Sequence, residues 1–164
     1  MKKIEADDIF FTKVNLPFGW LGNMSPYPVV FNNQRWLTTE ALFQALRFED
    51  DAIREEIRAQ KSPMGAKMKA KAHKIKMVLT PMSSQDVENM KMCVKMKINQ
   101  HSSLKSLLIA TGERKIYEDI GNRRGARHLF WGAKNENGFW VGENKMGEIW
   151  MNQRLELLLN TRTF

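Results

Sequence analysis

Apolar residues recur at helical spacing in the segment after Trp36, and this pattern constrains the fold more than any other in the chain. Thr38 and Thr39 precede the pattern, and both are good N-cap residues. The apolar stripe consists of Leu42, Leu46, Ile53 and Ile57. It predicts a helix of about 20 residues that ends at Arg58 and buries one face in a hydrophobic core.

A polar stripe runs along the same predicted helix, opposite the apolar one. It consists of Glu40, Gln44, Arg47 and Asp51, whose directions fall within about 40° of one another. Helical spacing alone predicts that this stripe is a solvated face. Phe43 and Phe48 lie on its flanks, and exposed aromatic rings there would indicate that something covers them. The residues therefore leave two interpretations open, a solvated face and the lining of a pocket.

The remaining patterns predict a helix-rich α+β fold in which the N-terminal part is rich in short strands and loops. Turn formers surround β-type runs such as "VVF" between Ile9 and Trp36. Further helices are predicted over "SPMGAKMKAKAHKIKM" with Ser62 as cap and Pro63 in the first turn, and over "SSQDVENMKMCVKMKI" with another serine as cap and with Val87, Met90 and Val94 on one face. A helix over "SSLKSLLIATG" is predicted to end at Gly112. A last helix is predicted from about Asn144 to Leu159, with Met146, Ile149, Trp150 and Leu157 inward. Glycine-rich loops are expected from Gly121 to Gly142.

The length and charge of the chain restrict its class. Its 164 residues fit one domain, residues 1–164, and the 26 Lys+Arg against 18 Asp+Glu give a net charge of +8. Such a field concentrates polyanions, either nucleic acid or phosphorylated metabolites. Acids among the first residues, and the lack of a long apolar run, predict a soluble, unsecreted, cytoplasmic protein. Cys93, the only cysteine, is expected to be a half-buried packing residue in a reducing compartment.

Several other patterns are less specific. In "KMKAKAHKIK", Lys67, Lys71 and Lys74 share a helical face that is either solvated or a flank for nucleic acid. In "HLFWGAKNENGFWVGENKMG", two aromatic pairs among glycines are either core residues or a platform for a base. The three histidines have no metal-ligand spacing with one another or with Cys93, and no catalytic serine order or phosphate-binding glycine motif occurs. No metal or cofactor is therefore expected.

Several motifs, taken together, resemble the NADAR superfamily, also known as YbiA-like proteins. They are "FGWLGNMSPYPVVFNNQRWLTTEALFQALRFEDDAIREEI", "SPMGAK", "LLIATGERKIYE", "FWG" and "GENKMGEIWMNQR", in that order from about Phe18 to Leu158. The resemblance implies an α+β fold and an N-glycosidase that acts on ribosylated nitrogen compounds. Members of the family hydrolyse phosphoribosylaminopyrimidine intermediates of riboflavin synthesis, or remove ADP-ribose from modified guanine in DNA.

The resemblance also implies a set of site residues and moves the polar stripe into a pocket. Glu40, Arg47 and Glu118 are the expected catalytic residues, with the Glu40 carboxylate stabilising positive charge on the sugar as the C1′–N bond breaks. The expected substrate-binding residues are Trp20, Asn23, Gln44, Phe48, Trp131, Gly132, Asn144, Gly147 and Arg154. Among these, Gln44 and Asn144 would hold ribose hydroxyls, the two tryptophans would contact base or sugar, and Arg154 would join Arg47 near anionic groups.

Three residues depart from the family pattern. Ala41 stands where the family has histidine, Arg47 where it commonly has lysine, and His128 where an aspartate often occurs. The span from Glu118 to Trp131 is also longer than usual. Because arginine stays protonated, it can bind an anion but cannot act as an amine, a role that Lys145 is a candidate to take over.

Three hypotheses follow. The net charge of +8 favours an N-glycosidase acting on ADP-ribosyl-guanine in DNA over one acting on a small riboflavin precursor. The departures at Ala41, Arg47 and His128 are consistent with a catalytically weak module that binds ADP-ribose-like ligands or a partner protein. A scaffold or virion protein that kept only the fold is the third hypothesis. A free-standing short form would suit a phage protein acting in a host cytoplasm, and the sequence gives no indication of its oligomeric state.

Overall fold

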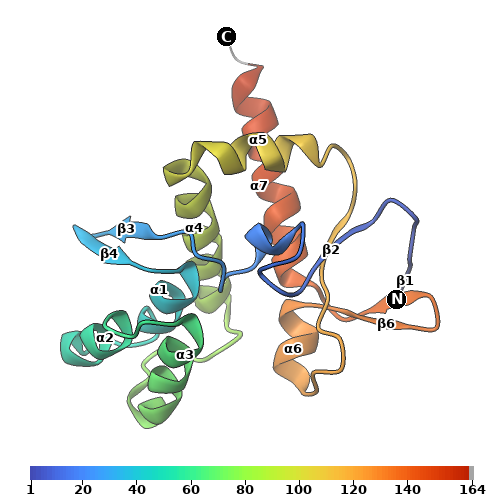
Figure 1. The fold of residues 1–164 in the computed structure, drawn as a ribbon. Coiled ribbons are helices and arrows are strands. Elements are labelled where there is room, and N and C mark those ends of the chain that lie inside the picture. The colour runs from blue at the N-terminus through green and yellow to red at the C-terminus, as the bar shows by residue number, and fades with distance from the viewer. Residues whose placement is uncertain (163–164) are drawn as a thin grey trace. The chain divides into compact units, whose positions relative to one another are not determined.

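The computed structural model describes residues 1–162, which form two compact units. The first unit combines Met1–Gly22 with Ser102–Phe164, and the second consists of Asn23–His101 (Figure 1). Helices and several short sheets occur together, so the α+β fold class is confirmed. Within residues 1–162, every helix is too short or too polar to cross a lipid bilayer.

The second unit consists of a β-hairpin followed by helices. Its elements are β3 (Val29–Phe31), β4 (Gln34–Trp36), α1 (Thr39–Ala45), α2 (Asp51–Arg58), α3 (Pro63–Ala72), the 3-10 helix η2 (Lys74–Lys76) and α4 (Ser84–Gln100). Asn32 and Asn33 have φ angles of 49° and 60°, as the tight turn between antiparallel β3 and β4 requires. Ser62 and Ser83 cap α3 and α4, because their side chains accept the backbone N–H groups of Gly65 and Asp86. Both predicted caps are confirmed.

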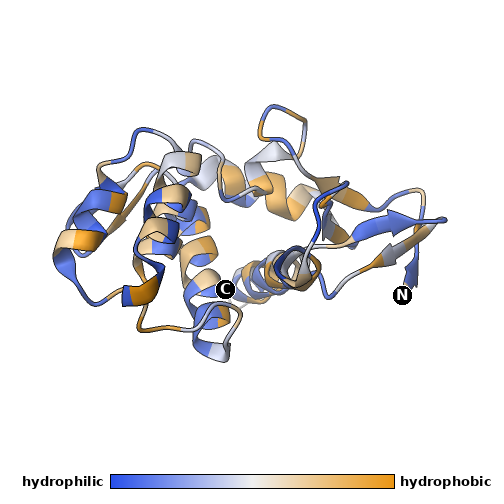
Figure 2. Cartoon of the chain, turned by 90° about the horizontal axis from the view of Figure 1, so that it is seen from below, coloured by the Kyte–Doolittle hydropathy of each residue, from blue (hydrophilic) through white to orange (hydrophobic). Residues whose placement is uncertain are grey.

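The prediction of one helix through Arg58 is wrong, because the chain breaks between α1 and α2. The carboxylate of Asp50 accepts the backbone N–H groups of Ala52 and Ile53 and so begins a new helix. The two short helices pack against each other and against α3, while α1 also contacts α4 (Figure 1). The apolar stripe survives the break, since three of its four members are fully buried and Leu46 is half-buried. In Figure 2, the helices of this unit, at the left, carry hydrophilic and hydrophobic residues side by side.

The first unit is built around two sheets and the helix α7. Its elements are β1 (Lys2–Lys3), β2 (Ile9–Phe11), the 3-10 helix η1 (Gly19–Leu21), α5 (Ser102–Ala110), β5 (Ile116–Glu118), α6 (Ala126–Trp131), β6 (Lys134–Glu136), β7 (Phe139–Val141) and α7 (Lys145–Thr161). Strand β2 pairs with β5 in parallel, and β1, β7 and β6 form an antiparallel sheet. Strands therefore also occur where glycine-rich loops were predicted. Asn137 and Gly138, both with positive φ, make the β6–β7 turn, a hairpin signal that the sequence carried.

Four buried tryptophans contribute to the core of this unit, namely Trp20, Trp131, Trp140 and Trp150. Trp150 of α7 is fully buried, and its indole N–H donates to the carbonyl of Leu21 at 3.0 Å. Trp140 stacks on Tyr117 with 4.7 Å between ring centroids. In both aromatic pairs of the glycine-rich segment the tryptophan is buried, while the phenylalanine is at least partly exposed. The prediction of a core role is thus met by Trp131 and Trp140. Leu157 of α7, predicted to point inward, is half-buried.

The start of α7 lies directly on β5, and Gly147 permits this contact. A Cβ atom at Gly147 would collide with the carbonyl oxygen of Ile116 and with the side chain of Asn144. Backbone and a buried carboxamide cannot move aside as a flexible side chain could. The close packing of α7 on β5 therefore depends on the absence of a side chain at this position.

Gly147→Ala is expected to destabilise the protein by about 2 to 3 kcal/mol, because overpacking of this kind forces a shift of the backbone. Gly112→Ala serves as the matched control, since it has a φ of 62° and nothing within 4 Å of the added Cβ atom. There the cost should be about 1 kcal/mol, from the left-handed backbone alone. Urea unfolding of both variants measures the difference, and equal losses would contradict the packing argument.

Candidate functional site

A chain of buried polar groups links α1 to α4 in the second unit. Glu40, Gln44 and Arg47 have exposed fractions of 9%, 5% and 4%. The Gln44 side-chain N–H donates to Oε1 of Glu40 at 2.8 Å, and Arg47 Nη1 donates to Oε1 of Gln44 at 3.2 Å. Arg47 in turn donates to both carboxylate oxygens of Asp86, from Nε at 2.9 Å and from Nη2 at 2.8 Å. The solvated face predicted from helical spacing is therefore wrong, because α4 covers it.

Asp86 is the member of this chain that sequence reasoning missed. Its side chain is fully buried, and Oδ2 also accepts the backbone N–H of Met82 at 2.8 Å. A signal for it existed, because Asp86 stands four residues before Met90 and therefore on the predicted inward face of α4. An acid on an inward helical face needs a buried cation, and Arg47 supplies it.

Arg47 is held on three sides. Besides its bonds to Asp86 and Gln44, its guanidinium carbon lies 4.6 Å from the centroid of the Phe43 ring. A lysine at this position could not make the two-pronged contact with the carboxylate, because its ammonium is a single point of charge. Phe43 and Phe48, whose position indicated that something covers them, are both buried in the core. Phe48 lies in the break after α1, where its carbonyl accepts the Nε–H of Arg54 at 2.6 Å.

Glu40 occupies the first turn of α1, where the N-terminal end of the helix dipole favours a negative charge. Thr38 caps this turn, and the Glu40 backbone N–H donates to the carbonyl of Asn23 at 3.1 Å. Gln44 is the one hydrogen-bond donor to the carboxylate among residues 1–162. Glu40 keeps an exposed fraction of 9%, the largest of the three linked residues. A carboxylate held in one orientation can stabilise a developing positive charge.

The segment from Asn23 to Tyr27 lies against the same face of α4. The Asn23 side chain accepts the Thr39 hydroxyl at 3.1 Å and donates to the sulfur of Met90 at 3.0 Å. The Lys97 ammonium donates to the Ser25 hydroxyl at 2.7 Å and lies 5.2 Å from the centroid of the Tyr27 ring. Asn23, a predicted site residue, is thus brought next to the helix that carries Glu40.

Two titratable groups on α4 are shifted by burial. Desolvation lowers the pKa of Lys97 to about 7. One helical turn earlier, desolvation raises the pKa of Cys93, and the negative charges of Glu40 and Asp86 add to this effect. Cys93 is fully buried rather than half-buried as predicted. The buried face of α4 therefore carries two charged residues, Asp86 and Lys97, that the apolar pattern did not indicate, among the hydrophobic residues Met90, Cys93, Val94 and Ile98.

The other predicted site residues belong to the first unit, and several of them gather around β5. The Asn144 side chain donates to the carbonyl of Ile116 at 2.8 Å and accepts the backbone N–H of Glu118 at 3.0 Å. It thus pairs with β5 as a neighbouring strand would, which leaves one N–H and one lone pair of the carboxamide for other partners. Gly132 touches the same strand, since a Cβ there would lie 2.5 Å from the carbonyl oxygen of Glu118. The Glu118 carboxylate is half-buried, and Arg123 lies 4.0 Å from it.

Trp20, Trp131 and Arg154 lie elsewhere in this unit. Trp20 packs edge-on against Trp150, with 5.7 Å between ring centroids, and Trp131 packs edge-on against Phe130 at the end of α6. Arg154 follows Asn144 by ten residues, about 15 Å along α7. Its Nη1 donates to the Thr111 hydroxyl at 2.8 Å and to the carbonyl of Arg114 at 2.9 Å.

Arg154 and Lys145, two basic residues of α7, both have partners within this unit. Arg154 hydrogen-bonds to uncharged oxygens, and its pKa is lowered, chiefly by desolvation. The Lys145 ammonium lies 3.2 Å from Glu148 and 4.0 Å from Glu143, both exposed acids. Lys97, and not Lys145, is therefore the buried lysine with a pKa near neutrality. Of the departures from the family pattern, Ala41 is buried and His128 lies on α6.

A search of the described residues found no group of three or more His, Cys, Asp or Glu side chains that could hold a metal ion.

A family model described as the NADAR domain matches residues 9–158. The chain belongs to the NADAR family. The match includes most of both units and begins ahead of Phe18, where the resemblance was placed from the sequence.

Individual NADAR proteins support the same conclusion. The N-glycosidase YbiA of Escherichia coli strain K12 is 30% identical over 151 residues, which cover 92% of this chain and 89% of YbiA. The riboflavin biosynthesis protein VVA0006 of Vibrio vulnificus is 27% identical over 159 residues, which cover 94% of this chain and 40% of that protein. The NMR structure of E. coli YbiA matches with a TM-score of 0.79 and 27% identity, covering 100% of this chain and 93% of that chain. The chain is accordingly an N-glycosidase in the general sense, an enzyme that hydrolyses a glycosyl bond.

Asp86→Asn is expected to destabilise the protein by about 3 to 5 kcal/mol, because it leaves the buried Arg47 guanidinium without its counter-charge. Glu88→Gln is the matched control, since Glu88 pairs with Lys91 on the exposed face of the same helix. That change should cost less than about 1 kcal/mol. Urea unfolding at neutral pH measures the free energy of unfolding of both variants. A decrease for Asp86→Asn no larger than for the control would contradict a stabilising role of the Arg47–Asp86 pair.

Lys97 should make stability rise with pH. The folded state releases the Lys97 proton near pH 7, whereas the unfolded chain holds it up to about pH 10.4, so the unfolded state binds more protons between these values. The slope should approach about 1 kcal/mol per pH unit from pH 7 to about 8.5, above which the Cys93 thiol opposes it.

Lys97→Met isolates this effect, and Lys95→Met, an exposed position on the same helix, is the control. Unfolding free energies from pH 6.5 to 8.5 are the measurement. We expect Lys97→Met to lack the slope that the wild type and the control share. Parallel curves for all three proteins would contradict a lowered pKa at Lys97.

Proposed function

We propose that this chain hydrolyses the C1′–N bond of ADP-ribosyl-guanine in DNA. The observation that carries the proposal is the buried chain from Asp86 through Arg47 and Gln44 to Glu40, which fixes one oxygen of the Glu40 carboxylate. Breaking a glycosyl bond creates positive charge on the sugar, and a fixed carboxylate lowers the energy of that transition state. The net charge of +8 supports a polyanionic substrate.

Glu40 is the proposed catalytic carboxylate. It stands in the first turn of α1 and is held by the hydrogen bond from Gln44, and a carboxylate placed in this way can stabilise an oxocarbenium-like sugar. Gln44 retains a second side-chain N–H and is proposed to reach a ribose hydroxyl. Asn23 and Phe48 are proposed to support this side of the substrate site through the backbone around α1.

Arg47 is proposed to act as a fixed cation. Three of its five N–H donors bond to Asp86 and Gln44, so its proposed contribution is to hold Gln44, and through it Glu40, in one orientation. These bonds favour a positioning role for the arginine that stands in place of lysine, because a guanidinium cannot exchange a proton near neutral pH.

Residues of the first unit keep, as proposals, the roles that the family resemblance implies for them. Asn144 would use its remaining N–H on a ribose hydroxyl, and Glu118 would act on the water or the leaving base. Trp20 and Trp131 would contact base or sugar, with Gly132 and Gly147 allowing close approach of the backbone. Arg154 would serve anionic groups.

Two other functions have support. The name of the Vibrio vulnificus relative refers to riboflavin biosynthesis, which favours a ribosylaminopyrimidine phosphate as the second candidate substrate. Ala41 stands where the family pattern has histidine, and His128 where it often has aspartate. These two departures favour a weakly catalytic module that binds ADP-ribose-like ligands. Both alternatives predict no release of ADP-ribose from DNA.

The test measures release of ADP-ribose from single-stranded DNA that carries ADP-ribosyl-guanine. Wild type should turn it over, and Glu40→Gln should lower kcat by roughly 10² to 10⁴ while ADP-ribose still raises the melting temperature. Glu49→Gln, an exposed change between α1 and α2, is the control and should keep full activity.

A ribosylaminopyrimidine phosphate is assayed in parallel with the same three proteins. Turnover of that compound alone would replace the DNA substrate with the riboflavin precursor. Absence of turnover of either compound, with stabilisation by ADP-ribose, would identify a binding module.

A further inference from the structure

The surface formed by α3 and η2 in the second unit carries a high density of positive charge. Residues 61–78 contain six lysines and no Asp or Glu. The lysines are Lys61, Lys67, Lys69, Lys71, Lys74 and Lys76. Glu56 of α2 pairs with this surface, since it lies 3.5 Å from Lys69 and 3.0 Å from His73. Lys71, Lys74 and Lys76 are exposed.

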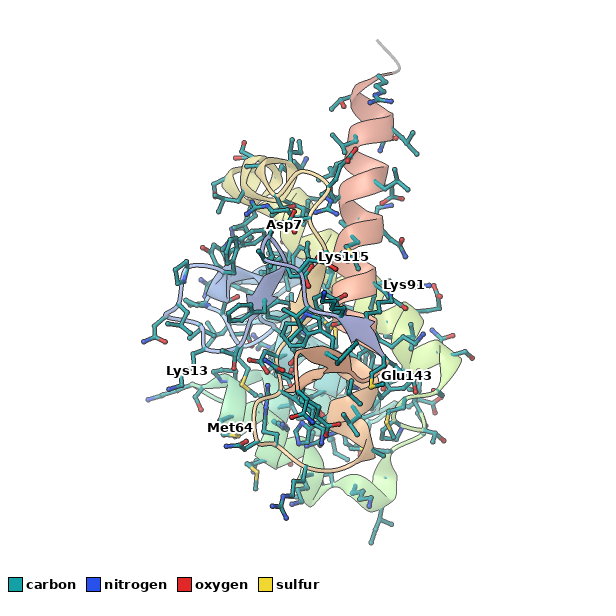
Figure 3. All side chains as sticks on the ribbon, turned by 90° about the vertical axis from the view of Figure 1, so that its right-hand side faces the viewer. Asp7, Lys13, Met64, Lys91, Lys115 and Glu143 are labelled. Carbon is teal, nitrogen blue, oxygen red and sulfur yellow. The ribbon has the colours of Figure 1, made fainter. Side chains whose placement is uncertain are left out.

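Apolar side chains are interleaved with these lysines. Met64 and Met68, one helical turn apart on α3, are each 52% exposed, while Ala66 and Ala70 form the buried side of the helix. Figure 3 labels Met64 on α3, at the lower left of the view. Ile75 in η2 is 101% exposed and stands between Lys74 and Lys76 in the sequence.

We propose that the α3–η2 surface binds a nucleic-acid strand, with the lysines on phosphates and Met64, Met68 and Ile75 against bases. The inference rests on the proposed function, because it supplies the surface by which an enzyme acting on modified DNA would hold the strand. The partner is recognised by its chemistry, a regular row of phosphates flanked by flat apolar rings.

The spacing of the cations fits such a partner. Lys71 near the end of α3 and Lys74 and Lys76 in η2 are all exposed and form a row of three cations within six residues of the chain. One strand of duplex DNA presents a phosphate about every 3.4 Å, so this row matches roughly three phosphates. Methionine side chains are flexible and polarisable, which suits contact with different bases, and an apolar side chain between cations can insert at a base step.

A membrane surface fits this segment less well. Interfacial helices bind lipid through large apolar residues such as Trp, Phe and Leu opposite their cations. Residues 61–78 contain none of these three residue types. Anionic vesicles are therefore a contrasting arm of the test and not the expected partner.

The first experiment measures binding of an unmodified 20-nucleotide single-stranded DNA by fluorescence anisotropy across a salt series. The variant combines Lys71→Glu, Lys74→Glu and Lys76→Glu, all at exposed positions. The control combines Lys2→Glu, Lys3→Glu and Lys115→Glu, which change the net charge equally at exposed positions of the first unit (Lys115 is labelled in Figure 3). A second variant with glutamine in place of the three α3–η2 lysines guards against misfolding caused by reversed charges.

The expected result is specific to the α3–η2 variant. Its affinity for the oligonucleotide should be lower by roughly tenfold or more. The slope of log K against log salt should become shallower by about 2, which corresponds to the loss of three phosphate contacts on a single strand. Ile75→Ser should weaken binding with the slope unchanged, because an apolar contact releases no counterions. Equal loss in variant and control would show a non-specific effect of net charge and overturn the proposal. Binding of wild type to anionic vesicles but not to the oligonucleotide would also overturn it.

A second readout separates this inference from the proposed function. The ratio of kcat/KM on DNA carrying ADP-ribosyl-guanine to kcat/KM on the free ADP-ribosyl nucleoside should fall roughly tenfold in the α3–η2 variant. Loss of oligonucleotide binding in that variant, in a protein that releases no ADP-ribose, would uphold the surface and reject the glycosidase substrate. Turnover of the DNA substrate, with no change in oligonucleotide binding or in the kcat/KM ratio in the variant, would uphold the glycosidase substrate and reject the α3–η2 surface.

Discussion

The buried ion pair between Arg47 and Asp86 is the interaction on which the second unit depends. Two charges are removed from water there, and the loss of hydration is offset by two short hydrogen bonds and by the attraction between opposite charges at low dielectric constant. Because the pair joins α1 to α4, it also determines where Gln44 and Glu40 lie. The same contact therefore serves the packing of the helices and the orientation of the proposed catalytic carboxylate.

Local rules predicted a large part of this architecture. Serine caps at α3 and α4, the apolar stripe of α1 and α2 and the helical character of α7 follow from helical periodicity and capping chemistry. The break at Asp50 was missed because an aspartate inside an apolar period can be read either as a polar helical residue or as a new cap. Only the packing of both short helices against α3 decides between these two readings.

Burial of the polar stripe could not be predicted from periodicity. A pattern of apolar residues predicts which face of a helix packs in the hydrophobic core. It gives no information on a polar face that is buried against other polar groups. Asp86 lies 39 residues from Arg47, and this long-range pairing made the stripe buried. The resemblance to the NADAR family indicated the functional importance of Glu40 and Gln44, yet it gave no partner for Arg47. The partner of Asn144 could not be predicted from local sequence either, because its side chain pairs with β5, 26 residues earlier in the chain.

The most direct test of this account is the kcat of Asp86→Asn on the glycosidase substrate, at a temperature where the variant is fully folded. Asp86 is fully buried, so it acts on catalysis through Arg47 and Gln44 rather than by contact with substrate. We expect kcat to fall roughly 10²-fold, because a displaced catalytic group loses that much rate, while Glu88→Gln stays at the wild-type value. A folded Asp86→Asn protein with wild-type kcat would show that the buried chain stabilises the fold without positioning Glu40, and would contradict the account.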